Sequence, residues 1–430
     1  MAIRLDATDP DFEARFAALL AAKREVAADV EATARAIVDD VRGRGDAALI
    51  EYTEKFDRLT LTPEKLRFSA EEIAAAIQDV SRTDIEALAV ARERIESYHR
   101  RQMPEDDRYT DAEGVELGTR WTAIEAVGIY VPGGTAAYPS SVLMNAVPAK
   151  IAGVERIVMV TPTPGGKTNP LVLAAAKMTG VDEIYRLGGA QAIAALAHGT
   201  ETIEPVAKIV GPGRDYVAAA KRLVFGTVGI DMIAGPSEVL VVADADNDPE
   251  WLAADLLAQA EHDEAAQSIL ITDSAALAER VSDAVERQLK ALRRAEIAAA
   301  SWREHGAIIT VRSLAGAMQL ANRIAPEHLE LAVAKPEALL ARVRNAGAVF
   351  LGRHTPEAIG DYVGGPNHVL PTARSARFSS GLSVFDFIKR TSILKLGPEQ
   401  LRALAKPAVA LAEAEGLEAH ARSIAIRLNL

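Results

Sequence analysis

The chain contains no cysteine among its 430 residues. That absence excludes a disulfide framework, a thiolate zinc site, an iron–sulfur cluster and a cysteine nucleophile. Any metal must therefore be bound by nitrogen and oxygen atoms of His, Asp, Glu, Gln or Asn side chains.

The chain also lacks an excess of basic residues, because 60 acidic side chains outnumber 48 basic ones and give a net charge of −12. This balance disfavours a nucleic-acid backbone as the main partner. No apolar run approaches the roughly 20 residues of a membrane span, and the acidic residues near the start do not suit a signal or transit peptide. We therefore expect a cytoplasmic protein with neither nucleic acid nor membrane as a partner.

The order of apolar segments predicts an α/β protein. Residues 1–120 are typical of helices. Beyond Trp121, short β-branched runs that end in Gly or Pro alternate with helical stretches, first from "AVGIYVPGG" to "AKIVGPG" and again from "EVLVVADAD" to "AGAVFLG". This alternation favours parallel sheets built from βα units, and its repetition predicts two similar open-sheet domains. From Gly381 onward the pattern predicts helix again, ending in an amphipathic tail.

Two glycine-rich turns, in Tyr130–Ser141 and Leu187–Leu196, each follow an expected strand and precede an expected helix. Ligands of open α/β sheets bind at such points. Two interpretations remain open: the turns offer N–H groups to a phosphate-bearing ligand, or they are simply tight turns. An ordinary Rossmann dinucleotide site is not supported, because no G-x-G-x-x-G with an acidic residue about 20 positions further on is present.

The segment "RIAPEHLEL" (Arg323–Leu331) places Glu327 beside His328 in an apolar frame. Burial of a charged group is costly unless the group is paired. The pair is therefore either a satisfied structural contact or the chemical centre of an enzyme, and the residue pattern alone leaves both open.

Other polar side chains also stand in apolar surroundings. Gln259 and His262 share a helix face, and an amide oxygen with an imidazole can bind a borderline metal, although most single helical histidines lie at the surface. Asp361 follows a glycine, where an aspartate commonly caps a turn. Further polar residues in such settings are His368, Glu415 and His420. Four histidines have exposed-looking contexts and receive no role, namely His99, His198, His305 and His354.

Several long motifs, in a fixed order from about Thr122 to the end, resemble the histidinol dehydrogenase family. They are "GPSEVLVVAD", "LLAQAEHDEAAQSIL", "RIAPEHLEL", "GDYVGGPNHVLPTARSARFSSGLSVFDFIKRTS" and "AEGLEAHARSIAIRLNL". The resemblance implies a zinc-dependent, NAD-linked enzyme that oxidises L-histidinol through L-histidinal to L-histidine, at the end of histidine biosynthesis. It also implies a homodimer with one Zn²⁺ per subunit and active sites shared between subunits.

The resemblance assigns roles to matching positions. Glu327 and His328 match the catalytic pair. The matching zinc ligands are Gln259, His262, Asp361 and His420. These six residues match substrate-binding positions too, together with Ser237, His368 and Glu415. Tyr130 and Gln191 match cofactor contacts in the two glycine-rich turns. Glu415 and His420 would come from the partner subunit.

The family implies two incomplete Rossmann-like open parallel-sheet domains. We expect a helical N-terminal region over 1–120 that partly joins the second α/β domain, a first α/β domain on the cofactor side over 121–236, and a second one with the metal and catalytic residues over 237–380. Residues 381–430 form the tail. The motifs suggest no role for Glu330.

One position departs from the family pattern. After "GPG" the family usually carries Asn at the cofactor side, whereas this chain has Arg214. Two interpretations stay open: the arginine meets the cofactor's ribose or a phosphate, which would alter affinity or NAD/NADP preference, or it is a neutral surface change.

The chemistry suggests how the pair divides its work. Imidazole has an unperturbed pKa near 6.5, which suits His328 as the base for the hydroxyl proton, and Glu327 would activate water for the aldehyde. Two alternatives remain: a related enzyme that oxidises another small alcohol, or a non-catalytic metal- or nucleotide-binding module. NADH formation with L-histidinol separates the three.

Overall fold

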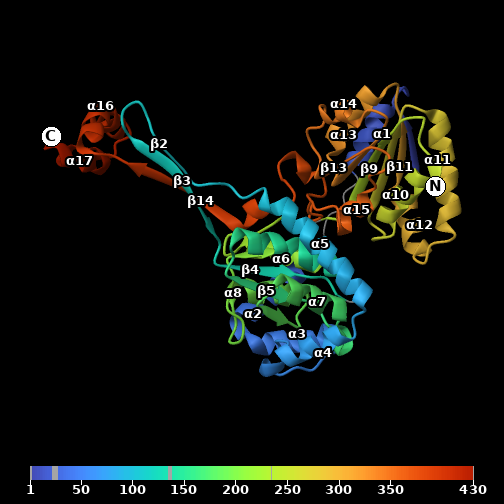
Figure 1. The fold of residues 1–430 in the computed structure, drawn as a ribbon, viewed down its shortest axis with the longest axis horizontal. Helices are drawn as coiled ribbons and strands as arrows, with labels where there is room; N and C mark the ends of the chain where they lie inside the picture. The colour runs from blue at the N-terminus through green and yellow to red at the C-terminus, as the bar shows by residue number, and fades with distance from the viewer. Residues whose placement is uncertain (1, 22–27, 134–137, 234, 430) are drawn as a thin grey trace.

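The computed structural model describes residues 2–21, 28–133, 138–233 and 235–429. The chain forms two α/β units, each built around an open sheet, and an arm that extends away from both units (Figure 1). The N-terminus lies in one unit, whereas the C-terminal helices lie at the far end of the arm.

The first unit contains a five-stranded sheet with strand order β6-β5-β4-β7-β8, and every neighbouring pair is parallel. Its strands are β4 (Ala126–Tyr130), β5 (Arg156–Val160), β6 (Glu183–Tyr185), β7 (Lys208–Val210) and β8 (Gly229–Ile230). Its helices are α6 (Pro139–Ala152), α7 (Pro170–Thr179), α8 (Gly189–His198) and α9 (Asp215–Val224). The predicted βα units are confirmed here.

The second unit contains a six-stranded parallel sheet with strand order β1-β11-β10-β9-β12-β13. Its strands are β1 (Ile3–Asp6), β9 (Glu238–Ala243), β10 (Gln267–Thr272), β11 (Ala307–Thr310), β12 (His328–Ala332) and β13 (Ala348–Leu351). Its helices are α1 (Phe12–Ala21), α10 (Pro249–Ala260), α11 (Ala275–Leu289), α12 (Ala295–Glu304), α13 (Leu314–Ile324), α14 (Pro336–Leu340) and α15 (Glu357–Tyr362). The prediction of two open parallel sheets is confirmed.

Both sheets are covered on both faces, so each strand divides its side chains between two apolar cores. On β12, Leu329 and Leu331 enter one core of the second unit. His328 and Glu330 alternate with these leucines and therefore point to the opposite face, toward α10 and α15. This alternation places polar side chains in a buried layer.

The N-terminal region is mainly helical, as predicted, and it packs on the first unit. α2 contacts α8 and α9, α4 contacts α7, and α5 contacts α6. These helices are α2 (Ala28–Arg44), α3 (Asp46–Asp57), α4 (Ala70–Gln78) and α5 (Arg82–Arg100). The first residues depart from the helical prediction, because Ile3–Asp6 forms β1 and pairs with β11.

The arm combines an antiparallel sheet with two helices. Its strands have the order β14-β3-β2 and are β2 (Asp107–Thr110), β3 (Glu116–Ala123) and β14 (Ile388–Lys395). The helices are α16 (Pro398–Ala414) and α17 (Glu418–Ala425). The prediction of continuous helix from Gly381 was wrong for β14, which pairs along its whole length with a strand far away in the sequence. In the described part of the chain, no helix combines the length and apolarity that crossing a membrane requires.

Candidate active site

The predicted catalytic pair lies at the amino end of the second sheet. His328 is the first residue of β12 and pairs with Val239 and Ala348 at the starts of the neighbouring strands. The glycine-rich turns instead follow the carboxyl ends of β4 and β6 in the first sheet. Oγ of Ser141, near the start of α6, lies 3.5 Å from Nε2 of His368. The site is therefore formed between the two units.

The backbone of Glu238 orients both members of the pair. Its N–H donates to Oε2 of Glu327 at 2.9 Å, and its carbonyl lies 2.9 Å from Nδ1 of His328. A carbonyl can only accept, so the Nδ1 of His328 carries the proton and its Nε2 is left as an acceptor. Burial lowers the pKa of His328 to about 4, although the carboxylate of Asp361 opposes this shift. The imidazole is thus held neutral, with its unprotonated Nε2 facing Glu357 and Asp361.

Several of the other predicted polar residues of this unit lie close to one another near His328. Oδ1 of Asp361 lies 4.0 Å from Nε2 of His328 and 3.8 Å from Nδ1 of His368. Nε2 of Gln259 lies 3.2 Å from Nδ1 of His262. His262 is close enough that its charge would lower the pKa of both His328 and His368. The structure thus brings together residues from α10, β12, α15 and the loop that follows α15.

Gln259 is fully buried, and among the described residues its Oε1 has no hydrogen-bond partner. An amide oxygen left unsatisfied in this way costs about 1–3 kcal/mol. The amide oxygen, the imidazole of His262 and the carboxylate of Asp361 are the nitrogen and oxygen donors that suit a borderline metal. These donor types are chemically compatible with zinc.

Sequence reasoning missed Glu357, on the first turn of α15. Its Oε1 lies 3.8 Å from Nε2 of His328, and the side chain is 3% exposed. Glu357, Asp361 and His328 each bring one ligand atom within 4.8 Å of the others, so they form a second possible metal set. Burial, with Asp361 nearby, raises the pKa of Glu357. The spacing of four residues between Glu357 and Asp361 was the available signal, since it places both on one helix face.

Glu330 also has structural contacts that its sequence context did not reveal. Its Oε1 accepts the N–H of Glu357 at 2.7 Å and so satisfies the first turn of α15. Burial and the neighbouring Asp255 raise the pKa of Glu330, and burial raises the pKa of Asp255 to about 6. The two carboxyl groups share a side-chain hydrogen bond, which requires that one of them be protonated.

The predicted cofactor residues lie in the first unit. The hydroxyl of Tyr130 accepts the N–H of Gly189 at 3.2 Å, and burial raises the pKa of Tyr130 to about 12. Gln191 is buried in the first turn of α8. Part of the first glycine-rich turn, residues 134–137, lies outside the described residues. Arg214 is exposed, precedes α9 and forms a 3.2 Å ion pair with Asp263, the neighbour of His262.

Two of the predicted substrate and metal residues are not at the site within this chain. Glu415 and His420 are exposed on the arm, which extends away from both units (Figure 1). Ser237 immediately precedes Glu238 at the start of β9.

Outside the site, the expectation of an exposed His99 was wrong. The residue is buried, and its Nδ1 lies 2.8 Å from the carbonyl oxygen of Ile95.

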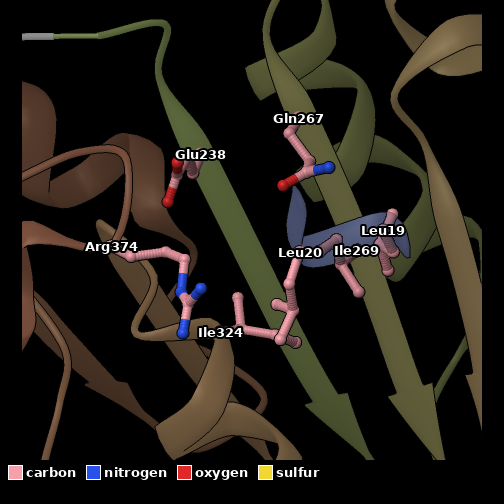
Figure 2. Close-up of a pocket in the computed structure, with 7 residues that line it drawn as sticks. All are labelled: Leu19, Leu20, Glu238, Gln267, Ile269, Ile324 and Arg374. Carbon is pink, nitrogen blue, oxygen red and sulfur yellow. The ribbon is translucent and has the colours of Figure 1, made fainter. Parts of the chain in front are cut away.

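A small cavity lies next to Glu238 (Figure 2). Its volume is about 20 Å³, which is enough for about one water molecule. The side chain of Arg374 extends toward Ile324 across the view. With a volume of about 20 Å³, the cavity is too small for a substrate. Its lining residues are Leu19, Leu20, Glu238, Gln267, Ile269, Ile324 and Arg374.

The fold and the polar cluster together define an α/β protein whose site, formed between two parallel-sheet units, combines a neutral buried histidine with carboxylates and metal-binding donors. The chain belongs to the histidinol dehydrogenase family, whose sequence profile matches residues 20–428. It is 71% identical to histidinol dehydrogenases of Agrobacterium fabrum, over 429 residues, and of Bradyrhizobium diazoefficiens, over 430 residues. These alignments cover all of this chain and 99% and 100% of the two relatives.

A solved structure agrees with this assignment. The crystal structure of histidinol dehydrogenase from Elizabethkingia anophelis superimposes with a TM-score of 0.95 at 39% sequence identity. The superposition covers 100% of this chain and 98% of the other.

Proposed function

We propose that this protein oxidises L-histidinol to L-histidine in two NAD-dependent steps through L-histidinal. The observation that carries the proposal is the buried neutral imidazole of His328, whose Nε2 faces Asp361 while its Nδ1 is bonded to a backbone carbonyl. The unprotonated Nε2 can accept a proton, which a general base must do, but burial makes it a weaker base than the pKa of 6.5 expected from the sequence. Family membership supports the choice of histidinol as the alcohol.

His328 takes the proton of the substrate hydroxyl through Nε2 as hydride passes to NAD⁺. The Glu327 carboxylate, which the N–H of Glu238 holds in place, then accepts a proton from the water that adds to the aldehyde. His328 gives its proton to the aldehyde oxygen as the water adds, which completes the hydrate and frees Nε2 again. The hydrate then loses a second hydride to another NAD⁺ and a proton to His328, and the carboxylic acid, His328 and Glu327 release their protons to solvent. One water is consumed and two NADH are formed for each histidinol.

Gln259, His262 and Asp361 would hold the zinc ion, with His420 of the partner subunit as the fourth ligand. Bound zinc is redox-inert and would orient the substrate and act as a Lewis acid. This set shares Asp361 with the alternative set of His328, Glu357 and Asp361. Among the described residues, unsatisfied buried atoms occur in both sets, namely Oε1 of Gln259 in the first and Nε2 of His328 and Oε2 of Glu357 in the second. We favour the first set because it leaves His328 available as a base.

The remaining substrate contacts would come from Ser237 and His368 of the same chain and from Glu415 of the partner subunit. A homodimer accounts for the exposed position of the arm in this chain. Its helices and their ends carry large exposed apolar side chains, namely Leu404, Leu411, Leu417 and Ile426. A second copy that covers this surface would remove apolar area from water.

NAD would bind at the carboxyl end of the first sheet, with contacts from Tyr130 and Gln191. Arg214 is engaged by Asp263, so its charge is partly balanced. We therefore expect Arg214 to affect cofactor affinity only modestly, since exposed pairs contribute about 0–1 kcal/mol. The domain division at about residues 121, 237 and 381 is part of the same proposal.

The test is an initial-rate assay of the purified protein with NAD⁺ and L-histidinol, beside other small amino alcohols. We expect NADH formation with L-histidinol and much slower rates with the other alcohols. Equal rates with an alcohol that lacks the imidazole would contradict the proposed substrate, and no NADH with any alcohol would contradict the proposed activity.

A further inference from the structure

The turns at the carboxyl end of the first sheet contact one another through the backbone. Gly211, in the turn after β7, has φ of 109°, a conformation that favours glycine. A Cβ at Gly211 would lie 2.2 Å from the carbonyl oxygen of Tyr130. The hydroxyl of Tyr130 in turn accepts the N–H of Gly189. A small shift of the Gly211 turn would therefore disturb both other turns.

A buried ion pair holds Gly211 in place. The pair consists of Lys221 of α9 and Asp231, the residue after β8, whose side chains are 2% and 1% exposed. The N–H of Gly211 donates to Oδ2 of Asp231 at 2.8 Å, and Nζ of Lys221 donates to the carbonyl of Gly211 at 3.0 Å. Both polar backbone groups of one residue are thus fixed by a charge pair.

The same pair also joins two other segments. Oδ1 of Asp231 accepts the N–H of Met232 at 2.6 Å, where the chain starts its passage to the second sheet. Lys221 lies in the helix that begins directly after Arg214. The pair therefore connects the Gly211 turn, α9 and the passage between the two units.

Stability alone is a weak reason for such a pair. Desolvation of two charges offsets much of their attraction, and apolar residues of similar volume often stabilise a core as well or better. A charge pair does provide directional hydrogen bonds that apolar residues cannot form. The observed contacts use these bonds on Gly211 and Met232.

We propose that Lys221 and Asp231 are positioning residues that hold the Gly211 turn in the shape that receives the dinucleotide. The inference rests on the proposed NAD-dependent function. It adds two residues that do not touch the reacting atoms and act through Gly211. Their loss should change cofactor binding more than histidinol binding.

The test compares Lys221→Met with the double variant Lys221→Met/Asp231→Asn. The single variant leaves an unpaired buried charge and should lose both thermal stability and NADH affinity. The double variant removes that charge but does not restore the hydrogen bond to the carbonyl of Gly211. We expect its melting temperature to recover while its dissociation constant for NADH stays raised roughly tenfold, the effect of losing one hydrogen bond to a charged group.

Kinetics give a second readout. The KM for NAD⁺ of the double variant should rise by a similar factor, while its KM for L-histidinol should remain near the wild-type value. A pair with only a structural role would leave both values unchanged in the folded double variant.

Lys208→Met is the matched control. Lys208 begins β7 at the other end of the strand from Gly211, and its Nζ bonds Asp386 at 2.8 and 3.0 Å. This variant removes an ion pair from the same strand, so it should keep wild-type NADH affinity.

Wild-type NADH affinity in the folded double variant would overturn the inference. If the double variant does not fold, Lys221→Arg replaces it: the guanidinium can still pair with Asp231 but cannot reproduce the position of Nζ. We then expect a folded protein with weakened NADH binding, and wild-type affinity would again overturn the inference. Failure of the wild-type protein to bind NADH would instead contradict the proposed function itself.

Discussion

At the residue scale, the site depends on how neighbours fix the proton and donor positions of single side chains. His328 owes its neutral state to burial and its free Nε2 to the carbonyl of Glu238. Gln259 presents an unsatisfied oxygen because its nitrogen lies against His262. The backbone of Glu238 sets the first arrangement, and the three-residue spacing of Gln259 and His262 sets the second. Each leads to a separate prediction.

The two possible metal sets differ in which substitution removes the ion. With the ligands Gln259, His262 and Asp361, His262→Ala should lose almost all bound zinc, whereas Glu357→Gln should retain it. Metal content measured by elemental analysis of protein purified without chelator checks this. The reverse pattern would assign the metal to His328, Glu357 and Asp361.

A strong chelator should abolish wild-type activity, and added Zn²⁺ should restore it.

The two members of the catalytic pair should fail at different steps. His328→Ala removes the base for both oxidations, so kcat with L-histidinol should fall by about 10²–10⁴-fold. Glu327→Gln should slow the first hydride transfer less, because its carboxylate acts on water afterwards. In single-turnover traces with L-histidinol, Glu327→Gln should slow formation of the second NADH, and supplying hydrated L-histidinal should bypass part of this defect. No such bypass would contradict its role.

At the element scale, the buried carboxyl pair of Asp255 and Glu330 joins α10 to β12, and Glu330 also satisfies the start of α15. These three elements carry Gln259, His328 and Asp361. Asp255 and Glu330 therefore link the elements that carry the site, through the contact between the two carboxyl groups and the hydrogen bond from the N–H of Glu357 to Glu330.

This pair should make stability depend on pH. The folded pKa of Asp255, about 6, lies above its usual value of 3.8. The native state therefore binds more protons than the unfolded state between these values, and the contribution of Asp255 to stability falls as pH rises through that window. Asp255→Asn keeps a donor toward Glu330 without a titrating proton.

We expect the melting temperature of Asp255→Asn, relative to wild type, to increase from pH 4 to pH 7. Thermal unfolding of both proteins in matched buffers across this range measures the difference. A constant or decreasing difference would show that Asp255 does not titrate with a raised pKa.

The sequence predicted the elements better than their pairing. Alternating apolar runs were enough to predict both parallel sheets, because each βα unit carries its own local signal. β14 was missed because its eight residues become a strand only by pairing with β3, more than 250 residues away. Glu357 and Glu330 were missed since their importance depends on contacts between α15, β12 and α10. The burial of His99 likewise follows from packing that a local pattern does not show.

At the scale of the whole molecule, the arm separates Glu415 and His420 from the cluster that they are proposed to complete (Figure 1). A shared site in a two-fold dimer makes a quantitative prediction. Mixing inactive His420→Ala with inactive His328→Ala, with subunit exchange, should restore activity to roughly a quarter of wild type. Half of the dimers would be hybrids, and each hybrid has one intact site.

The assay is NADH formation after the two variants are mixed at equal concentration, with exchange confirmed by mass spectrometry. No recovery despite exchange would show that the tail does not act on the partner subunit.

The central claim is that one site performs both oxidations. It is tested most directly by the amount of NADH formed when a limiting quantity of L-histidinol is consumed completely in excess NAD⁺. We predict two NADH per L-histidinol, with L-histidine as the product and no free aldehyde trapped. One NADH per substrate with accumulation of L-histidinal would contradict the account.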